Sequence, residues 1–146
     1  NQDIGKWDVG NGIIFTAMFA KAFEFNKDIS GWNVSKGTSF SGMFTNAHAF
    51  DQPIGGWNVS NGANFSWMFA NILANSTHAF NQNISGWDVG NGTTFSRMFL
   101  NAYNFNQDIS NWNVSSGAIL YQMFQGANMM NTNHGLQSTS PRAYFN

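Results

Sequence analysis

The chain contains no cysteine, two prolines and few charged residues. The absence of cysteine excludes disulfide frameworks, thiolate nucleophiles and cysteine-based zinc sites. Charged residues make up 9% of the chain and the formal net charge is −1, so no basic patch is present to follow a phosphate backbone. No apolar run approaches the roughly 20 residues of a membrane span. Nucleic acid is therefore excluded as a partner, and no membrane span is expected.

Aromatic residues, in contrast, are abundant. They make up 16% of the chain and include 15 phenylalanines, which gives ample apolar surface for a folded core. With 146 residues the chain is long enough for one domain. It opens on NQDIG, without a signal peptide or an initiator methionine. This start predicts a processed product or a piece of a longer protein.

The sequence repeats itself. Tryptophan recurs at positions 7, 32, 57, 87 and 112, and the pair Met-Phe at 18–19, 43–44, 68–69, 98–99 and 123–124. These landmarks define five units, which span residues 1–25, 26–50, 51–80, 81–105 and 106–130. The third unit carries an insertion of five residues near 71–75. Residues 131–146 lack the pattern and are predicted to form a C-terminal cap or linker. Small units of this kind bury their apolar faces by stacking.

Each unit divides into two halves, as the second unit illustrates. In residues 26–37, Trp32 and Val34 lie two positions apart, as in a half-buried strand. In residues 38–47, apolar residues follow the helical spacing i, i+3, i+4 and i+7, at Phe40, Met43, Phe44 and Ala47. The pattern predicts an α/β solenoid, a stack of five strand-turn-helix units with a parallel sheet.

The repeat also resembles a known family. The segments FNQDISNWNVSSG (105–117) and YQMFQGA (121–127) are similar to a bacterial surface-protein repeat of about 25 residues. That repeat occurs in lipoproteins and wall-anchored proteins and is related to BspA-like leucine-rich repeats. The resemblance implies a leucine-rich-repeat-like solenoid at the cell surface, used for adhesion or surface display without catalysis. It supplies no ligand-binding residues.

The recurring tryptophans are interpreted as a buried column whose indole N–H groups bond to a neighbouring unit; a platform for sugar rings is the alternative. Trp67 is different, because its position reads Ala17, Gly42, Trp67, Arg97 and Gln122 across the units. It also precedes the apolar insertion residues Ile72 and Leu73. We predict a contact surface made of Trp67, Ile72 and Leu73. The alternative is that the insertion folds over Trp67 and covers it.

Asparagine dominates the polar residues. One column, Asn1, Asn26, Asp51, Asn81, Asn106 and Asn131, predicts a ladder that satisfies backbone groups between units. Seven Asn-x-Ser/Thr triplets are candidate glycosylation sites: Asn33, Asn58, Asn64, Asn75, Asn83, Asn91 and Asn113. Because several share a repeat position, ladder chemistry is the competing explanation.

No constellation of catalytic or metal-binding residues stands out. Asp3, Asp28 and Asp108 share a column, but Pro53 and Asn83 interrupt it, and calcium requires converging oxygens. The histidines have no carboxylate or hydroxyl partner at a recognisable spacing. The sequence therefore predicts no enzyme activity, no metal and no cofactor.

The sequence predicts a non-catalytic extracellular structural protein at the cell surface. The two ends of the stack of units would contact further repeats of a longer chain, or they would stack head to tail with other copies to form a filament. The candidate end-stacking residues are Ile4, Trp7, Tyr144 and Phe145. The alternative is an adhesin-type module that recognises a host protein or a carbohydrate.

Overall fold

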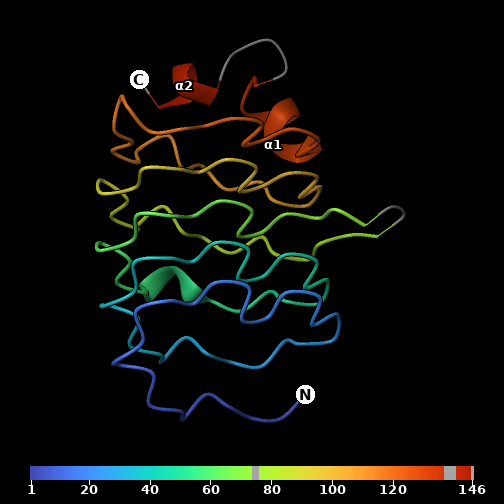
Figure 1. Ribbon diagram of the computed structural model, residues 1–146. Coiled ribbons are helices and arrows are strands. Elements are labelled where there is room, and N and C mark those ends of the chain that lie inside the picture. Colours follow the sequence, from blue (N-terminus) through green and yellow to red (C-terminus); the bar gives the residue numbers. More distant parts are fainter. Residues whose placement is uncertain (74–75, 137–140, 146) are drawn as a thin grey trace.

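The protein is described here by a computed structural model, which covers residues 1–73, 76–136 and 141–145. The backbone winds into five stacked coils, with the N-terminus at one end of the stack and the C-terminus at the other (Figure 1). We number the coils by the repeat units: coil 1 (1–25), coil 2 (26–50), coil 3 (51–80), coil 4 (81–105) and coil 5 (106–130). Backbone hydrogen bonds join residues at matching positions of neighbouring coils.

Regular secondary structure is scarce in the described residues. It consists of the 3-10 helix η1 (Ile54–Gly56) and two short helices after the main stack, α1 (Asn128–Asn133) and α2 (Pro141–Tyr144). Strand pairing is limited to isolated parallel bridges that join Ile14, Ser39, Asn64, Thr94 and Ile119 in turn. The predicted α/β solenoid, with its leucine-rich-repeat-like units and parallel sheet, is therefore wrong.

Hydrogen bonding explains why the predicted helix does not form. In coil 2 the N–H groups of Phe40, Gly42 and Phe44 donate to carbonyls of coil 3, at 2.8–2.9 Å. The N–H groups of Met43 and Thr45 instead close turns onto the carbonyl three residues earlier, those of Phe40 and Gly42, at 3.1 and 3.0 Å. An α-helix would direct every N–H to the carbonyl four residues earlier. Here every second N–H of the segment bonds to the next coil instead.

Left-handed residues maintain this alternation. Gly42 and Asn46 have φ of 60° and 56°, and the corresponding Ala17 and Lys21 of coil 1 have φ of 54° and 61°. A right-handed helix cannot contain such residues, because its φ lies near −63°. The helical spacing of apolar residues therefore arises from a series of turns that places the same side chains inside.

The core consists of stacked aromatic columns. The ring centroid of Phe44 lies 5.7 Å from that of Phe69 in the next coil, and the two rings are 5° from parallel. It lies 3.9 Å from the ring centroid of Phe50 in the same coil. The apolar positions predicted for one helix face in coil 2 are all fully buried. The side-chain pattern was thus interpreted correctly as core, although the backbone conformation was not.

The tryptophan column is confirmed as core in four of the five coils. Four of these side chains are almost completely buried, and each donates its indole N–H to an isoleucine carbonyl of the preceding coil at 3.1 Å: Trp32, Trp57, Trp87 and Trp112. Trp7 in coil 1 is the exception, with 62% of its surface exposed. Coil 1 therefore presents an uncovered aromatic face.

The polar ladder is confirmed in the middle of the stack. Asn26 accepts the backbone N–H of Asp51 at 2.9 Å, Asp51 accepts that of Asn81 at 2.9 Å, and Asn81 accepts that of Asn106 at 2.8 Å. The two end members differ. The side chain of Asn1 donates to Glu24 within coil 1, and that of Asn131 lies in α1 and donates to the carbonyl of Phe124.

The C-terminal segment covers coil 5. The ring centroid of Phe145 lies 6.4 Å from that of Trp112, and the two rings are 5° from parallel. An aromatic ring of a further coil would stack on Trp112 in the same way. Arg142 donates to the carbonyls of Ser115 and Ala118. In the middle of the stack the carbonyl equivalent to that of Ser115 accepts an asparagine side chain of the next coil, as from Asn91 at 2.8 Å. The segment thus reproduces contacts of a sixth coil.

Candidate binding site

Trp67 lies on a lateral face of the stack, where it is partly buried. The guanidinium carbon of Arg97, in the next coil, lies 4.7 Å from the centroid of the indole ring and 4.9 Å from that of Tyr121. A cation held over aromatic faces is stabilised by the ring quadrupole. One side of Trp67 is therefore occupied by the cation from coil 4.

The other side of Trp67 borders a groove. Gly42 occupies the equivalent position in coil 2 and has no side chain, and Ala17 follows in coil 1. The groove has a volume of about 350 Å³ and is open to solvent. Its lining residues come from coils 1, 2 and 3: Thr16, Ala17, Ala20, Ser41, Gly42, Thr45, Trp67 and Ile72. Small residues below a large indole thus create the hollow.

The insertion supplies one wall of the groove. The side-chain oxygen of Asn46 accepts the backbone N–H of Ile72 at 2.7 Å and that of Leu73 at 3.3 Å. The described chain on either side of positions 74–75 projects from the side of the stack (Figure 1). Ile72 and Leu73 remain 49% and 39% exposed. Ile72 lines the groove together with Trp67, whereas Leu73 does not, so the structure brings together two of the three residues predicted for a contact surface.

Two of the three hydroxyl groups that line the groove, those of Thr16 and Thr45, are engaged within the protein, and the third belongs to Ser41. Thr45 donates its hydroxyl to the carbonyl of Trp67 at 2.7 Å, and this bond fixes the backbone that carries the indole. The hydroxyl of Thr16 is bonded to that of Ser39 at 2.8 Å. The groove therefore offers methyl groups and an aromatic ring more than free hydrogen-bonding groups.

The charges of this lateral face have one sign. We define the face by five equivalent segments: 16–22, 41–47, 66–72, 96–102 and 121–127. Lys21 and Arg97 are the charged side chains in these segments, and all seven acidic residues of the chain lie elsewhere. Although the whole chain has a formal net charge of −1, the lateral face is cationic.

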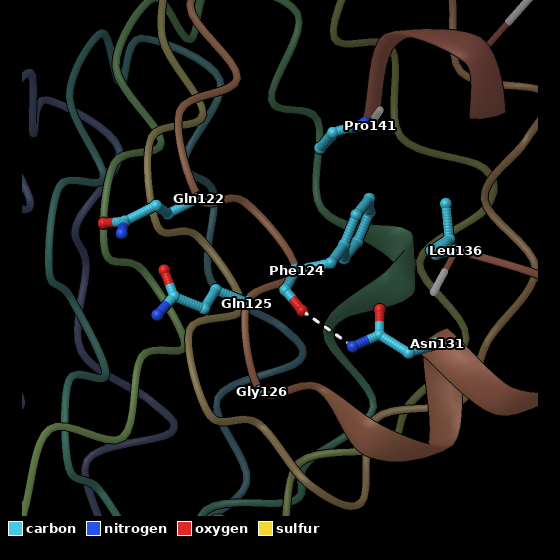
Figure 2. A pocket seen from close by; sticks show the side chains of 7 residues that line it. All are labelled: Gln122, Phe124, Gln125, Gly126, Asn131, Leu136 and Pro141. Carbon is cyan, nitrogen blue, oxygen red and sulfur yellow. Dashed lines mark hydrogen bonds between the residues drawn. The ribbon is translucent and has the colours of Figure 1, made fainter. Parts of the chain in front are cut away.

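A second cavity lies between coil 5 and the C-terminal segment (Figure 2). It is lined by Gln122, Phe124, Gln125, Gly126, Asn131, Leu136 and Pro141. The side chain of Asn131 donates to the Phe124 carbonyl at 3.3 Å and closes one side of it. Leu136 and Pro141 flank positions 137–140, which lie outside the described residues, so we assign no site there.

The candidate glycosylation sites fall into different environments. Asn33 and Asn58 each accept the backbone N–H and the hydroxyl of the serine two residues later, which is an Asx turn. Asn83 accepts the Ser85 N–H, and Asn64, which is half-buried, accepts that of Ser66. Two further members, Asn91 and Asn113, are exposed, and Asn75 lies outside the described residues. Glycan attachment stays a prediction at these positions.

The aspartate column has a local role. Asp3, Asp28 and Asp108 each accept the backbone N–H of the residue two positions later, at 2.9–3.1 Å. Hydrogen bonds from the side chain and backbone of Ser30 lower the pKa of Asp28. Within the described residues no three histidine or acidic side chains converge as metal ligands would. The column stabilises turns.

The histidines differ in burial. His78 is 1% exposed; one ring nitrogen lies 3.0 Å from the carbonyl oxygen of Phe44, and the other accepts the Phe80 N–H at 3.3 Å. Burial in the apolar core lowers the pKa of His78 to about 4. This neutral histidine holds the chain after the insertion against coil 2, a structural role that the sequence did not reveal.

The proposed end-stacking residues lie at opposite ends of the stack. Ile4 is buried and Trp7 is exposed in coil 1. Tyr144 and Phe145 pack against coil 5 of their own chain, where the Tyr144 hydroxyl also bonds to Asp108 at 3.1 Å. Stacking with another copy through these residues stays a prediction. In the described residues no helix has the length and apolar character needed to cross a membrane.

Comparison with known proteins corrects the family assignment. The family model described as "Mycoplasma protein of unknown function, DUF285" matches residues 1–78 and again residues 71–143. No curated protein and no solved structure matches the chain. The predicted lipoprotein-type, BspA-like leucine-rich-repeat relationship is therefore replaced, since the coils also lack the strands and helices that it implied.

Several descriptions expected from the sequence are corrected as well. The described residues contain too few paired strands for a leucine-rich-repeat-like solenoid. Neither the structure nor the family match supports filament, adhesion or glycoprotein as descriptions. Because the two matches together span nearly all of its residues, the chain belongs to the DUF285 family, whose function is unknown.

Proposed function

We propose that this chain is a non-catalytic binding module that takes an apolar group of a partner into the groove beside Trp67. The observation that carries the proposal is the indole itself, which has the Arg97 guanidinium on one side and the groove over Gly42 on the other. Trp and Arg are the residues most enriched among those that dominate binding energy at interfaces.

Pre-organisation supports this function. The cation–π contact and the hydrogen bond from Thr45 to the Trp67 carbonyl hold the indole and its backbone in place before any partner arrives. An ordered side chain loses little conformational entropy on binding, so more of the contact energy appears as affinity. The left-handed backbone of Trp67 belongs to the fold, because Ala17 and Gln122 share it at φ of 54°.

Nuclear magnetic resonance of the isotopically labelled chain tests the groove directly. The neutral probe N-acetyl-leucinamide should shift the indole N–H signal of Trp67 in a saturable way and leave that of the buried Trp57 unchanged. Gly42→Gln places a side chain below the indole and should weaken binding of the probe at least tenfold. A glutamine is compatible with this backbone, because Gln122 occupies the equivalent position at φ 54°.

The matched control is Gly31→Gln. Gly31 is exposed on a turn and has open space where a Cβ would be added. This variant should bind the probe as the unsubstituted chain does. Equal binding by the Gly42→Gln variant, or no saturable shift at Trp67, would contradict the proposal.

A second candidate function is a structural one, in which coil 1 packs against a coil of another copy or against further repeats. It is favoured by the exposed face of coil 1, where Trp7, Ile13 and Ile14 are each at least 55% exposed. Sedimentation equilibrium over a range of concentrations tests association between copies. Trp7→Ser should lower any association constant, and an unchanged constant would count against this face.

A further inference from the structure

We infer that the partner of the groove is an acidic protein segment, whose carboxylate binds Arg97 while a neighbouring apolar side chain fills the space beside Trp67. This inference rests on the binding function proposed above and adds the chemistry of the ligand. The feature that carries it is Arg97, a cation fixed between two aromatic rings and without an anionic neighbour in the lateral face.

Arg97 is held in a fixed orientation. Its Nε donates to the side-chain oxygen of Gln122 at 2.6 Å, while Trp67 and Tyr121 flank the guanidinium carbon. No hydrogen bond from its two terminal nitrogens is found within the described residues. These nitrogens carry the donor fork that matches a carboxylate in bidentate geometry.

The charge distribution selects an anionic partner. Lys21 and Arg97 are the two charges of the lateral face, so a carboxylate that approaches it meets cations and no acidic side chain of this face. Complementary charge increases the rate of association and discriminates against cationic or neutral partners. An anion therefore fits this face better than a neutral ligand of the same shape.

The lining of the groove favours a protein over a sugar. A bound sugar ring brings several hydroxyl groups, each of which must keep a hydrogen bond or lose free energy on leaving water. The hydroxyls of Thr16 and Thr45 are already bonded inside the protein, so Ser41 is left as the hydroxyl that the described lining offers to a sugar, while the other lining residues present mainly apolar surface. An aliphatic or aromatic side chain has no hydrogen bond to water to lose when it enters such surroundings.

The dimensions suit a short extended segment. Neighbouring coils related by parallel bridges lie about 4.8 Å apart, so the groove from coil 1 to coil 3 and Arg97 in coil 4 together span about 14 Å. Side chains two residues apart in an extended chain point to the same side and are about 7 Å apart. The centre of the groove in coil 2 is two coil spacings, about 10 Å, from Arg97 in coil 4. An apolar residue and an acidic residue separated by one residue would span most of this distance, and the lengths of their side chains cover the remainder.

The test uses the probe acetyl-Leu-Gly-Asp-amide and its partner acetyl-Leu-Gly-Asn-amide, titrated into the labelled chain at low salt. Both should shift the Trp67 indole signal, and the aspartate probe should bind at least fivefold more tightly. The ratio of the two affinities should fall towards one in 0.5 M salt, because exposed charges are screened. Arg97→Gln should remove the advantage at low salt, whereas Lys21→Gln should leave most of it.

The outcomes separate the two proposals. If both probes bind equally, the acidic partner is refuted and the groove remains a binding site. If neither shifts the Trp67 signal, both proposals fail. If glucuronate competes at Trp67 with a higher affinity than the aspartate probe, the partner is an acidic sugar and the assignment to protein is wrong. The salt dependence needs no variant, so it decides the role of charge even if Arg97→Gln does not fold.

Discussion

Acid should destabilise this protein in part through His78. Its ring lies in the core between the Phe44 carbonyl and the Phe80 N–H, and burial lowers its pKa from 6.5 to about 4. Protonation would place a second N–H against the Phe80 N–H and a charge in an apolar site. The unfolded chain therefore binds the proton at higher pH than the folded chain does.

The size and direction of the effect follow from linkage. Above about pH 6.5 the histidine is neutral in both states and its contribution to stability is complete. As the pH falls from 6.5 to about 4, the unfolded state gains protons first. The free energy of unfolding should then decrease by up to about 1.4 kcal/mol per pH unit and by about 3 kcal/mol in all.

The assay is urea unfolding, followed by tryptophan fluorescence at several pH values between 7.5 and 4. The His78→Asn variant is the reference, because it shares every other ionisable group with the unsubstituted chain. It should be less stable at pH 7.5, and its deficit should shrink as the pH falls. Parallel pH profiles for the two proteins, or a His78 resonance that titrates near pH 6.5 in the folded state, would refute the reasoning.

Two further substitutions test the packing between coils. A Cβ at Gly62 would overlap the Phe65 ring, so Gly62→Ala should lower the unfolding free energy by about 1–3 kcal/mol. Gly56→Ala, where the Cβ meets open space, should change it by less than about 1 kcal/mol in urea unfolding. Trp57→Phe removes the indole donor from the Ile29 carbonyl, which keeps the Trp32 N–H at 3.1 Å, and leaves space in the core, so it should cost about 1–3 kcal/mol. The exposed Trp7→Phe should cost little in the same measurement. Equal losses within either pair would contradict the packing described.

The repeat and its buried positions could be predicted from the sequence, because side-chain burial follows hydrophobicity directly. Phe44, Trp57 and the Asn26–Asp51 rung are located as the pattern predicted. The backbone could not be predicted from the same pattern. Spacing of i, i+3 and i+4 is shared by a helix and by a series of turns, and the left-handed residues that decide between them include Ala17, an ordinary helix former.

The candidate site was found only in part. Trp67 and Ile72 were identified because one breaks a repeat column and the other lies in the insertion. Gly42 was missed, because a glycine in the neighbouring repeat has meaning only when the two coils are stacked. Arg97 appeared in the same column, but nothing in the sequence shows that its guanidinium lies over the indole. Such contacts depend on the lateral offset between coils, which a period in the sequence does not specify.

The hydrogen bonds of the lateral face give the stack a chemical polarity. In coil 1 the N–H groups of Phe15, Ala17 and Phe19 donate to carbonyls of coil 2, and the same direction is kept in each following coil. The outer edge of coil 1 consequently carries the carbonyls of Ile14 and Thr16, which accept no hydrogen bond from the described residues. Two copies that met symmetrically along this edge would place acceptor against acceptor. Extension of the stack along this stretch therefore requires a partner edge that presents N–H groups, whereas just before it the bonds run the other way, from the Thr38 N–H to the Ile13 carbonyl at 2.8 Å.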